Sequence, residues 1–245
     1  MKIDDTLLSH CRNIAFSVAP ELRKRPLYIC SAELFRGLDL PDDGCLGLCF
    51  DGRITHFAYR ERIPEWTTPG PLIVLFGERI AADVNGDEDA FRDAVYGTLL
   101  HEVAHALPVR SDIPERDGAE IFDCELVRDW QHNKRQEADA LPAPDVDATD
   151  NPHNADFVRV AVHLLARARL IGWSISGLSL FCGDLWHIPQ PAHWVLVLMR
   201  EIVELQGEPF AEILSTPSPD EFSQLWERCV NFHFHRQSIC QEVRQ

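Results

Sequence analysis

Length, composition and charge set the first limits on this protein. The chain has 245 residues, 45% of them hydrophobic and 25% charged, which is typical of a globular protein with a buried core. Its formal net charge of −16 argues against a large nucleic-acid-binding surface, because such surfaces place Lys and Arg against phosphates. We therefore expect no nucleic-acid partner. The charge is compatible with a basic polypeptide substrate, but we favour solubility alone as its explanation, because charge speaks to association and not to function.

The sequence also lacks the features of a membrane or secreted protein. No apolar run approaches the roughly 18 residues that span a bilayer. The first residues, MKIDDTLLSH, have two Asp where a secretory signal has a basic segment followed by an apolar one. None of the eight Cys forms a C-x-x-C pair, so a zinc ribbon is not expected. We expect a cytoplasmic protein with free thiols and no membrane partner, although an even Cys count also allows disulfides.

The first part of the chain predicts one helix followed by strands. Residues 4–19 carry apolar side chains at helical spacing. Residues 27–35 combine β-branched and aromatic side chains and predict a strand that runs into a turn. Residues 45–59 alternate around an Asp-Gly pair, which predicts a hairpin. Residues 71–81 are an almost continuous apolar run bounded by turn residues and predict another strand.

Residues 91–107 have helical periodicity and contain the pattern H-E-x-x-H. In a helix, His101 and His105 lie one turn apart, so both imidazoles leave the same face and can reach one metal ion. Glu102 follows the first of them and would lie beside such a metal, where a base can take a proton from a bound water. Pro108 then ends the predicted helix.

Polar and helical segments follow the motif. Residues 109–152 form an acidic insertion bounded by Pro, predicted to be helical at first and then a loop. Residues 154–168 predict a helix with an apolar face, capped by Asn154. Residues 173–186 are ambiguous. From residue 192 onward, three apolar segments separated by Gly and Pro predict three helices.

The stretch TLLHEVAHAL resembles the zincin class of zinc-dependent metallopeptidases. The resemblance implies a tetrahedral zinc held by His101, His105 and a third residue, with a water in the open position and Glu102 as the general base. It also implies an α+β fold, with a small, mostly antiparallel sheet and the motif helix in residues 1–172. We expect residues 173–245 to form a mainly helical subdomain. The extended metzincin pattern is absent, because Pro and Ser stand at its Gly and third His positions.

Three residues are candidates for the third zinc ligand. His153 opens the 154–168 helix, which resembles the SprT-like and minigluzincin branch, where a third His begins the pattern H-G-x-x-F; here Asn replaces the Gly. Glu125, followed four residues later by Asp129, resembles the gluzincin arrangement. Glu137 stands in a similar acidic pattern. We favour His153, because neutral imidazole is the commonest ligand type and a helix-opening position fixes it rigidly.

Further predictions concern the surroundings of the site. In zincins the strand before the metal helix borders the cleft and pairs with an extended substrate, so residues 72–76 are the candidate edge strand. A buried central strand explains the same apolar run equally well. His163 is expected to pack in the core, with stabilisation of an oxyanion as the alternative. His233 and His235 are expected to pack at a helix end.

The function predicted from these patterns is zinc-dependent hydrolysis of peptide bonds in a polypeptide substrate. Two alternatives stay open. A deformylase-like amidase also uses H-E-x-x-H, with an upstream Cys as third ligand, and the sequence around Cys45 resembles that family. The second alternative is a zincin fold that binds a metal or a partner without turnover, because a fold alone does not imply a function.

Overall fold

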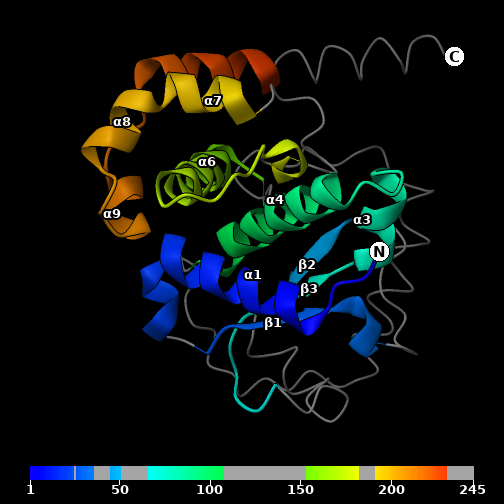
Figure 1. Ribbon diagram of the computed structural model, residues 1–245. Helices are drawn as coiled ribbons and strands as arrows, with labels where there is room; N and C mark the ends of the chain where they lie inside the picture. The colour runs from blue at the N-terminus through cyan, green and yellow to red at the C-terminus, as the bar shows by residue number, and fades with distance from the viewer. Residues whose placement is uncertain (25, 36–44, 51–65, 108–152, 182–190, 231–245) are drawn as a thin grey trace, which may run out of the picture.

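The computed structural model describes residues 1–24, 26–35, 45–50, 66–107, 153–181 and 191–230. Within these ranges the protein is α+β, as the sequence predicts, with a small three-stranded sheet and a larger helical part (Figure 1). Several predictions lie outside the described residues. They are the second half of the hairpin at 45–59, the insertion at 109–152, and the packing of His233 and His235.

The N-terminal segments form as their patterns indicate. Helix α1 (Asp5–Val18) is capped by Asp4, whose side chain accepts a hydrogen bond from a backbone N–H in the first turn at 2.8 Å. The 3-10 helix η1 (Pro20–Lys24) leads to strand β1 (Tyr28–Ser31) and then to a second 3-10 helix, η2 (Ala32–Phe35). The predicted helix and the predicted strand that runs into a turn are both confirmed.

Strand β3 (Leu72–Leu75) is the central strand of the sheet. It pairs in parallel with β1 and antiparallel with β2 (Gly47–Phe50), giving the order β1-β3-β2. The expectation of a mostly antiparallel sheet is therefore wrong for the described strands, because β3 runs in the direction of β1 after the chain has passed through β2. The proposal that residues 72–76 form an edge strand is wrong as well.

Both faces of β3 are covered, which explains its continuous apolar run. Ile73 and Leu75 belong to the main core shared with the helices, whereas Leu72 and Val74 belong to a second apolar cluster that contains Trp66. All four strand residues are at most 1% exposed. This is the pattern of a buried strand, and the sequence alone does not separate it from an apolar edge.

The strand predicted at 71–81 is also too long. It ends at Leu75, and helix α3 (Gly77–Asp83) follows. Phe76 and Ile80 are both buried and are four residues apart, which is the spacing of one helix face. A short apolar run does not by itself distinguish a strand from a buried helical turn.

Helix α4 (Glu88–Ala106) carries the H-E-x-x-H motif and packs against β2, β3 and helix α6 (Ala155–Leu170). Asp87 caps α4 by accepting hydrogen bonds from two backbone N–H groups of the first turn. Asn154 caps α6 in the same way. Both predicted helices are confirmed, and α4 begins three residues earlier than its apolar pattern because its first turn is polar and exposed.

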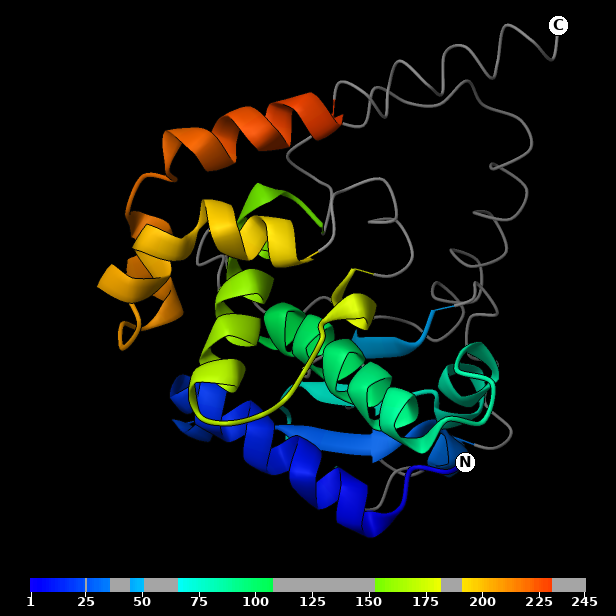
Figure 2. The same ribbon diagram turned by 45° about the horizontal axis from the view of Figure 1, so that its top comes forward.

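The C-terminal helices pack beyond α6 and reach back to the end of α1, where the backbone N–H of Phe210 donates to the Glu21 carboxylate of η1 (Figures 1 and 2). They are α7 (Pro191–Val197), α8 (Met199–Glu204) and α9 (Phe210–Ser215), followed by a helical segment at 220–230. The helices predicted from residue 192 onward are confirmed, although the first of the three predicted segments forms two consecutive helices. The boundary placed at residue 172 stays a prediction. None of the described helices is long and apolar enough to cross a membrane.

Candidate metal centre

Helix α4 presents two imidazoles on one face, and the turn before α6 brings a third. Nε2 of His153 lies 3.0 Å from Nε2 of His105 and 3.1 Å from Nε2 of His101. One ligand nitrogen from each residue falls within 4.8 Å of the others. A tetrahedral zinc with Zn–N distances of about 2.0–2.1 Å separates its ligand nitrogens by about 3.3 Å. The two distances from His153 are therefore within a few tenths of an ångström of the spacing that such an ion requires.

The orientation of His101 is set by a backbone carbonyl. Its Nδ1 lies 2.8 Å from the carbonyl oxygen of Leu180, in the 3-10 helix η3 (Leu178–Leu180). A carbonyl can only accept, so Nδ1 carries the proton and Nε2 keeps its lone pair. That lone pair belongs to the nitrogen that faces the other two histidines. A hydrogen bond of this kind on the remote nitrogen is usual for metal-binding imidazoles.

His153 is held in place by the start of α6. The side chain of Asn154 accepts a hydrogen bond from the backbone N–H of Phe157 at 3.0 Å and fixes the first turn of the helix. The ring of Phe157 packs against all three imidazoles, with centroid distances of 4.8, 4.5 and 4.8 Å to His101, His105 and His153. Phe157 thus covers the cluster from one side.

Burial keeps the two motif histidines neutral. It lowers the pKa of His101 to about 4, and repulsion from a charged His153 adds to the shift. Burial likewise lowers the pKa of His105 to about 3, with repulsion from His101 and His153 adding to it. Neutral imidazole is the form that binds a metal, so at neutral pH no proton has to leave these two side chains first.

Glu102 is a buried carboxylate, only 4% exposed. Burial raises its pKa to about 8, and a divalent cation nearby would oppose that shift. Within the described residues it makes no hydrogen bond or ion pair. Gly47 of β2 lies against it: a Cβ atom at that position would stand 2.8 Å from Glu102 Oε1. A buried carboxylate with no partner is costly for a fold and is a common feature of catalytic sites.

Sequence reasoning missed the groups that surround the cluster. Leu180 acts through its backbone oxygen, which leaves no signal in residue type. Gly97, in the middle of α4, lets η3 approach, because a Cβ atom there would stand 3.1 Å from Ser179 Cβ and 3.3 Å from the Leu180 nitrogen. A Gly inside a helix is the one signal that could have indicated this contact.

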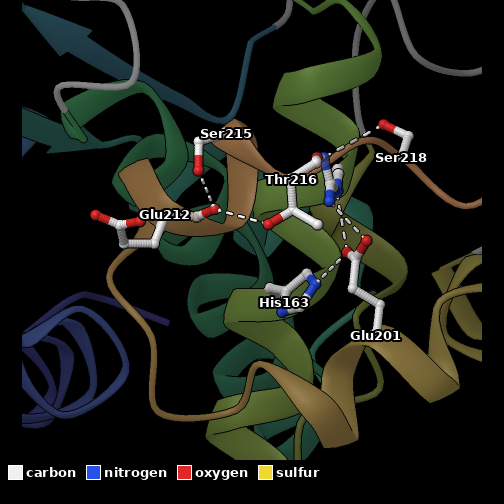
Figure 3. Close-up of polar contacts among 7 residues, drawn as sticks. His163, Glu201, Glu212, Ser215, Thr216 and Ser218 are labelled. Atoms are coloured by element: carbon white, nitrogen blue, oxygen red, sulfur yellow. Dashed lines mark hydrogen bonds and ion pairs between the residues drawn. The ribbon is translucent and has the colours of Figure 1, made fainter.

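Other candidates lie elsewhere. His163 is fully buried, and its Nε2 lies 2.7 Å from Glu201 Oε1 in a polar network between α6 and α8 (Figure 3), so its interpretation as a core residue is confirmed. Cys45 lies outside the histidine group and its Sγ contacts the Arg79 guanidinium at 3.6 Å. Glu125 and Glu137 fall outside the described residues.

Comparisons of the chain with models of protein families, with curated proteins and with solved structures found no match. The assignment of a function therefore depends on the residues of the centre and on their geometry.

Proposed function

We propose that this protein is a zinc-dependent metallopeptidase, with His101, His105 and His153 as the zinc ligands and Glu102 as the general base. The observation that carries the proposal is the convergence of three imidazole nitrogens near the H-E-x-x-H helix, whose Glu102 is buried and has no hydrogen-bond or ion-pair partner among the described residues. The finer assignment, a zincin fold of the SprT-like kind, rests on the motif and on the His-x-x-x-Phe spacing at the start of α6.

The donor set favours zinc over other common metals. Imidazole nitrogens suit Zn²⁺, whereas Mg²⁺ and Ca²⁺ prefer oxygen ligands. Three protein ligands leave the fourth tetrahedral position open, which is the arrangement of catalytic zinc sites. When bound, zinc supplies a Lewis acid for the scissile carbonyl and lowers the pKa of a water molecule towards 7.

The residues of the chain supply orientation and proton transfer. The Leu180 carbonyl holds His101 in the tautomer that directs Nε2 to the metal. Glu102 accepts a proton from the attacking water and delivers it to the leaving amine.

The two alternative functions have less support. A deformylase-like amidase would need Cys45 as a ligand, and Cys45 stands apart from the histidines beside Arg79. A metal-binding protein without turnover has no use for a buried Glu102 that lacks a partner within the part of the chain that the structure describes, because such burial costs stability. We propose a polypeptide substrate and no nucleic-acid partner, since the charge of −16 repels phosphates.

The test uses the full chain purified with zinc. We expect about one zinc per chain, cleavage of a mixed peptide pool detected by mass spectrometry, loss of cleavage on chelation, and recovery when zinc is restored. Glu102→Gln should keep the zinc and lose activity by about 10²- to 10⁴-fold. Glu88→Gln, which changes an exposed carboxylate of the same helix, is the matched control.

Two outcomes would overturn the proposal in different ways. Full activity of Glu102→Gln would remove Glu102 as the base. One bound zinc per chain with no cleavage of any peptide in the pool would favour a metal-binding protein without turnover.

A further inference from the structure

A cavity of about 220 Å³ opens between α3, α4 and η3. Its walls are mostly apolar and include Leu46, Ala94 and Leu178. Two carboxylate side chains, Asp83 and Asp93, also line it. The histidines and Glu102 are not part of its lining, so the cavity is distinct from the candidate metal centre.

The elements that form the walls of this cavity also contact the centre. Leu46 precedes Gly47, which lies against the Glu102 carboxylate. Helix η3 forms another wall, and its last residue accepts the hydrogen bond from His101. Ala94 lies eight residues before Glu102 on α4, which separates the two by about 12 Å along the helix axis at 1.5 Å per residue. The cavity therefore lies beside the candidate metal centre along α4.

The size and lining of the cavity fit one long side chain. Pockets for drug-sized ligands have volumes of about 300–1,000 Å³, more than this cavity offers. Asp93 is already engaged, because it accepts hydrogen bonds from the backbone N–H and the hydroxyl of Ser176 and so fastens the segment before η3 to α4. Asp83 is exposed and, among the described residues, makes no hydrogen bond or ion pair. A side chain with an aliphatic stem and a cationic end could pack its stem against the apolar walls and place its charge beside the Asp83 carboxylate.

We infer that this cavity is a substrate subsite that selects a lysine or arginine side chain, with its aliphatic stem against the apolar walls and its cation beside Asp83. The inference rests on the proposed peptidase function. An extended peptide advances about 3.3 Å per residue, so a separation of about 12 Å places the basic residue three to four residues from the cleaved bond. The net charge of −16 favours the approach of a basic polypeptide.

The first experiment measures binding, which does not depend on turnover. Capped nine-residue peptides of Ala, Ser and Gly carry one central guest residue, which is Lys, norleucine or Glu. Their dissociation constants are measured with zinc-supplemented Glu102→Gln protein. Norleucine has the length of the lysine stem without the charge, so it separates the apolar contribution from the ionic one. We expect the Lys peptide to bind about two- to fivefold more tightly than the norleucine peptide, as for a partly exposed ion pair.

Two further changes in the Glu102→Gln background locate the binding. Asp83→Asn should remove the difference between Lys and norleucine and leave norleucine binding unchanged. Ala90→Leu, which fills part of the same cavity without changing charge, should weaken both peptides. Glu212→Gln removes an exposed carboxylate from α9 and should change neither, which controls for a general effect of net charge.

The second experiment maps cleavage by the otherwise unchanged protein. In a mixed peptide pool, cut sites should have Lys or Arg enriched three to four residues away, and Asp83→Asn should reduce that enrichment. Equal binding of the Lys and norleucine peptides, or a difference that survives Asp83→Asn, would overturn the subsite whether or not peptides are cleaved. Binding that depends on Asp83 without cleavage of any peptide would keep the subsite and overturn the peptidase function.

Discussion

Nδ1 of His101 and the carbonyl oxygen of Leu180 lie 2.8 Å apart, although the two residues are separated by 79 positions in the chain. The chain leaves the motif helix, forms α6 and returns through η3 to fix the tautomer of the first motif histidine. Gly97 makes this return fit, because it leaves room for η3 against α4. The centre is therefore built from three parts of the chain: α4, the start of α6, and η3.

The third ligand is the first assignment that can be tested. We predict that His153→Ala weakens zinc binding by more than about 100-fold, because even loss of a partner that only orients a ligand costs about 10- to 100-fold. Isothermal titration with zinc under competition from a chelator gives the affinity. His193→Ala, at an exposed position on α7, is the matched control and should leave the affinity unchanged.

The acidic candidates for the same position are tested alongside His153. Glu125→Ala and Glu137→Ala should leave zinc affinity unchanged if His153 completes the site. A large loss of affinity in either variant, with little effect of His153→Ala, would contradict the three-histidine centre.

The cap of α6 gives a second prediction. Asn154→Ala removes the hydrogen bond to the first turn of α6 and should lower the free energy of unfolding by about 1 kcal/mol. Because His153 precedes this cap, zinc affinity should also fall by about tenfold, as for other losses of ligand orientation.

Asp4→Ala supplies the control for the cap. Asp4 accepts an equivalent hydrogen bond at the start of α1. We expect the same loss of stability in urea unfolding and no change in zinc affinity. Equal zinc affinities for the two variants would show that the cap does not position the ligand.

Gly47 tests the placement of Glu102. Gly47→Ala would put a Cβ atom 2.8 Å from Glu102 Oε1 and equally close to Thr98 Cγ2, so the carboxylate has to shift. We predict that peptide cleavage falls by about 10- to 100-fold while the zinc content stays at the wild-type level, because small displacements of a catalytic group are costly. Zinc analysis and cleavage assays on the same preparation separate the two effects.

Gly207→Ala is the corresponding control, because no atom lies within 4 Å of the Cβ position there. It should leave both zinc content and cleavage unchanged. Loss of zinc in Gly47→Ala would mean that β2 supports the metal ligands and not the carboxylate.

The parts of this centre that depend on local sequence could be predicted. The spacing of His101 and His105 follows from one helical turn, and the apolar face of α6 marks its start next to His153. Helical periodicity depends on neighbours within a few positions, so a single sequence reveals it.

The parts that depend on contacts between distant residues could not be predicted. The central place of β3 depends on which strands pair with it, and an apolar run such as 72–75 carries no information about its partners. The Leu180 carbonyl acts through the backbone, which every residue possesses. Asp83 and Leu46 meet around the cavity only after α3 and η3 have packed on α4.

A buried network of ion pairs and hydrogen bonds links α6 to α8 and to the segment after α9. Arg159 donates to both carboxylate oxygens of Glu201, at 2.9 and 2.7 Å, and His163 Nε2 lies 2.7 Å from the same carboxylate (Figure 3). Arg159 also donates to the backbone oxygen of Thr216, which ties the segment after α9 to α6. Glu201 is only 6% exposed. Removing its charge leaves a buried guanidinium without its counterion.

We predict that Glu201→Gln lowers the free energy of unfolding by about 3–5 kcal/mol at neutral pH, as for other broken buried pairs. Glu204→Gln, in an exposed pair with Arg200 on the same helix, should cost less than about 0.5 kcal/mol.

The difference in the free energy of unfolding between Glu201→Gln and the wild-type protein should also depend on pH. Burial by itself would raise the pKa of Glu201, but hydrogen bonds from His163 and Arg159 outweigh burial and hold the pKa below its ordinary value of 4.5. At a pH between the pKa of Glu201 in the folded protein and its pKa in the unfolded chain, the unfolded chain binds more protons. The ionised carboxylate therefore stabilises the folded protein. This stabilisation is complete above pH 4.5 and is lost as the pH falls through the pKa of the folded state. Urea unfolding of both proteins from about pH 7 down to about pH 3 should therefore show their stabilities converging at the acidic end. A difference that stays constant over this range would mean that the network stabilises α6 through packing and not through the charge of Glu201.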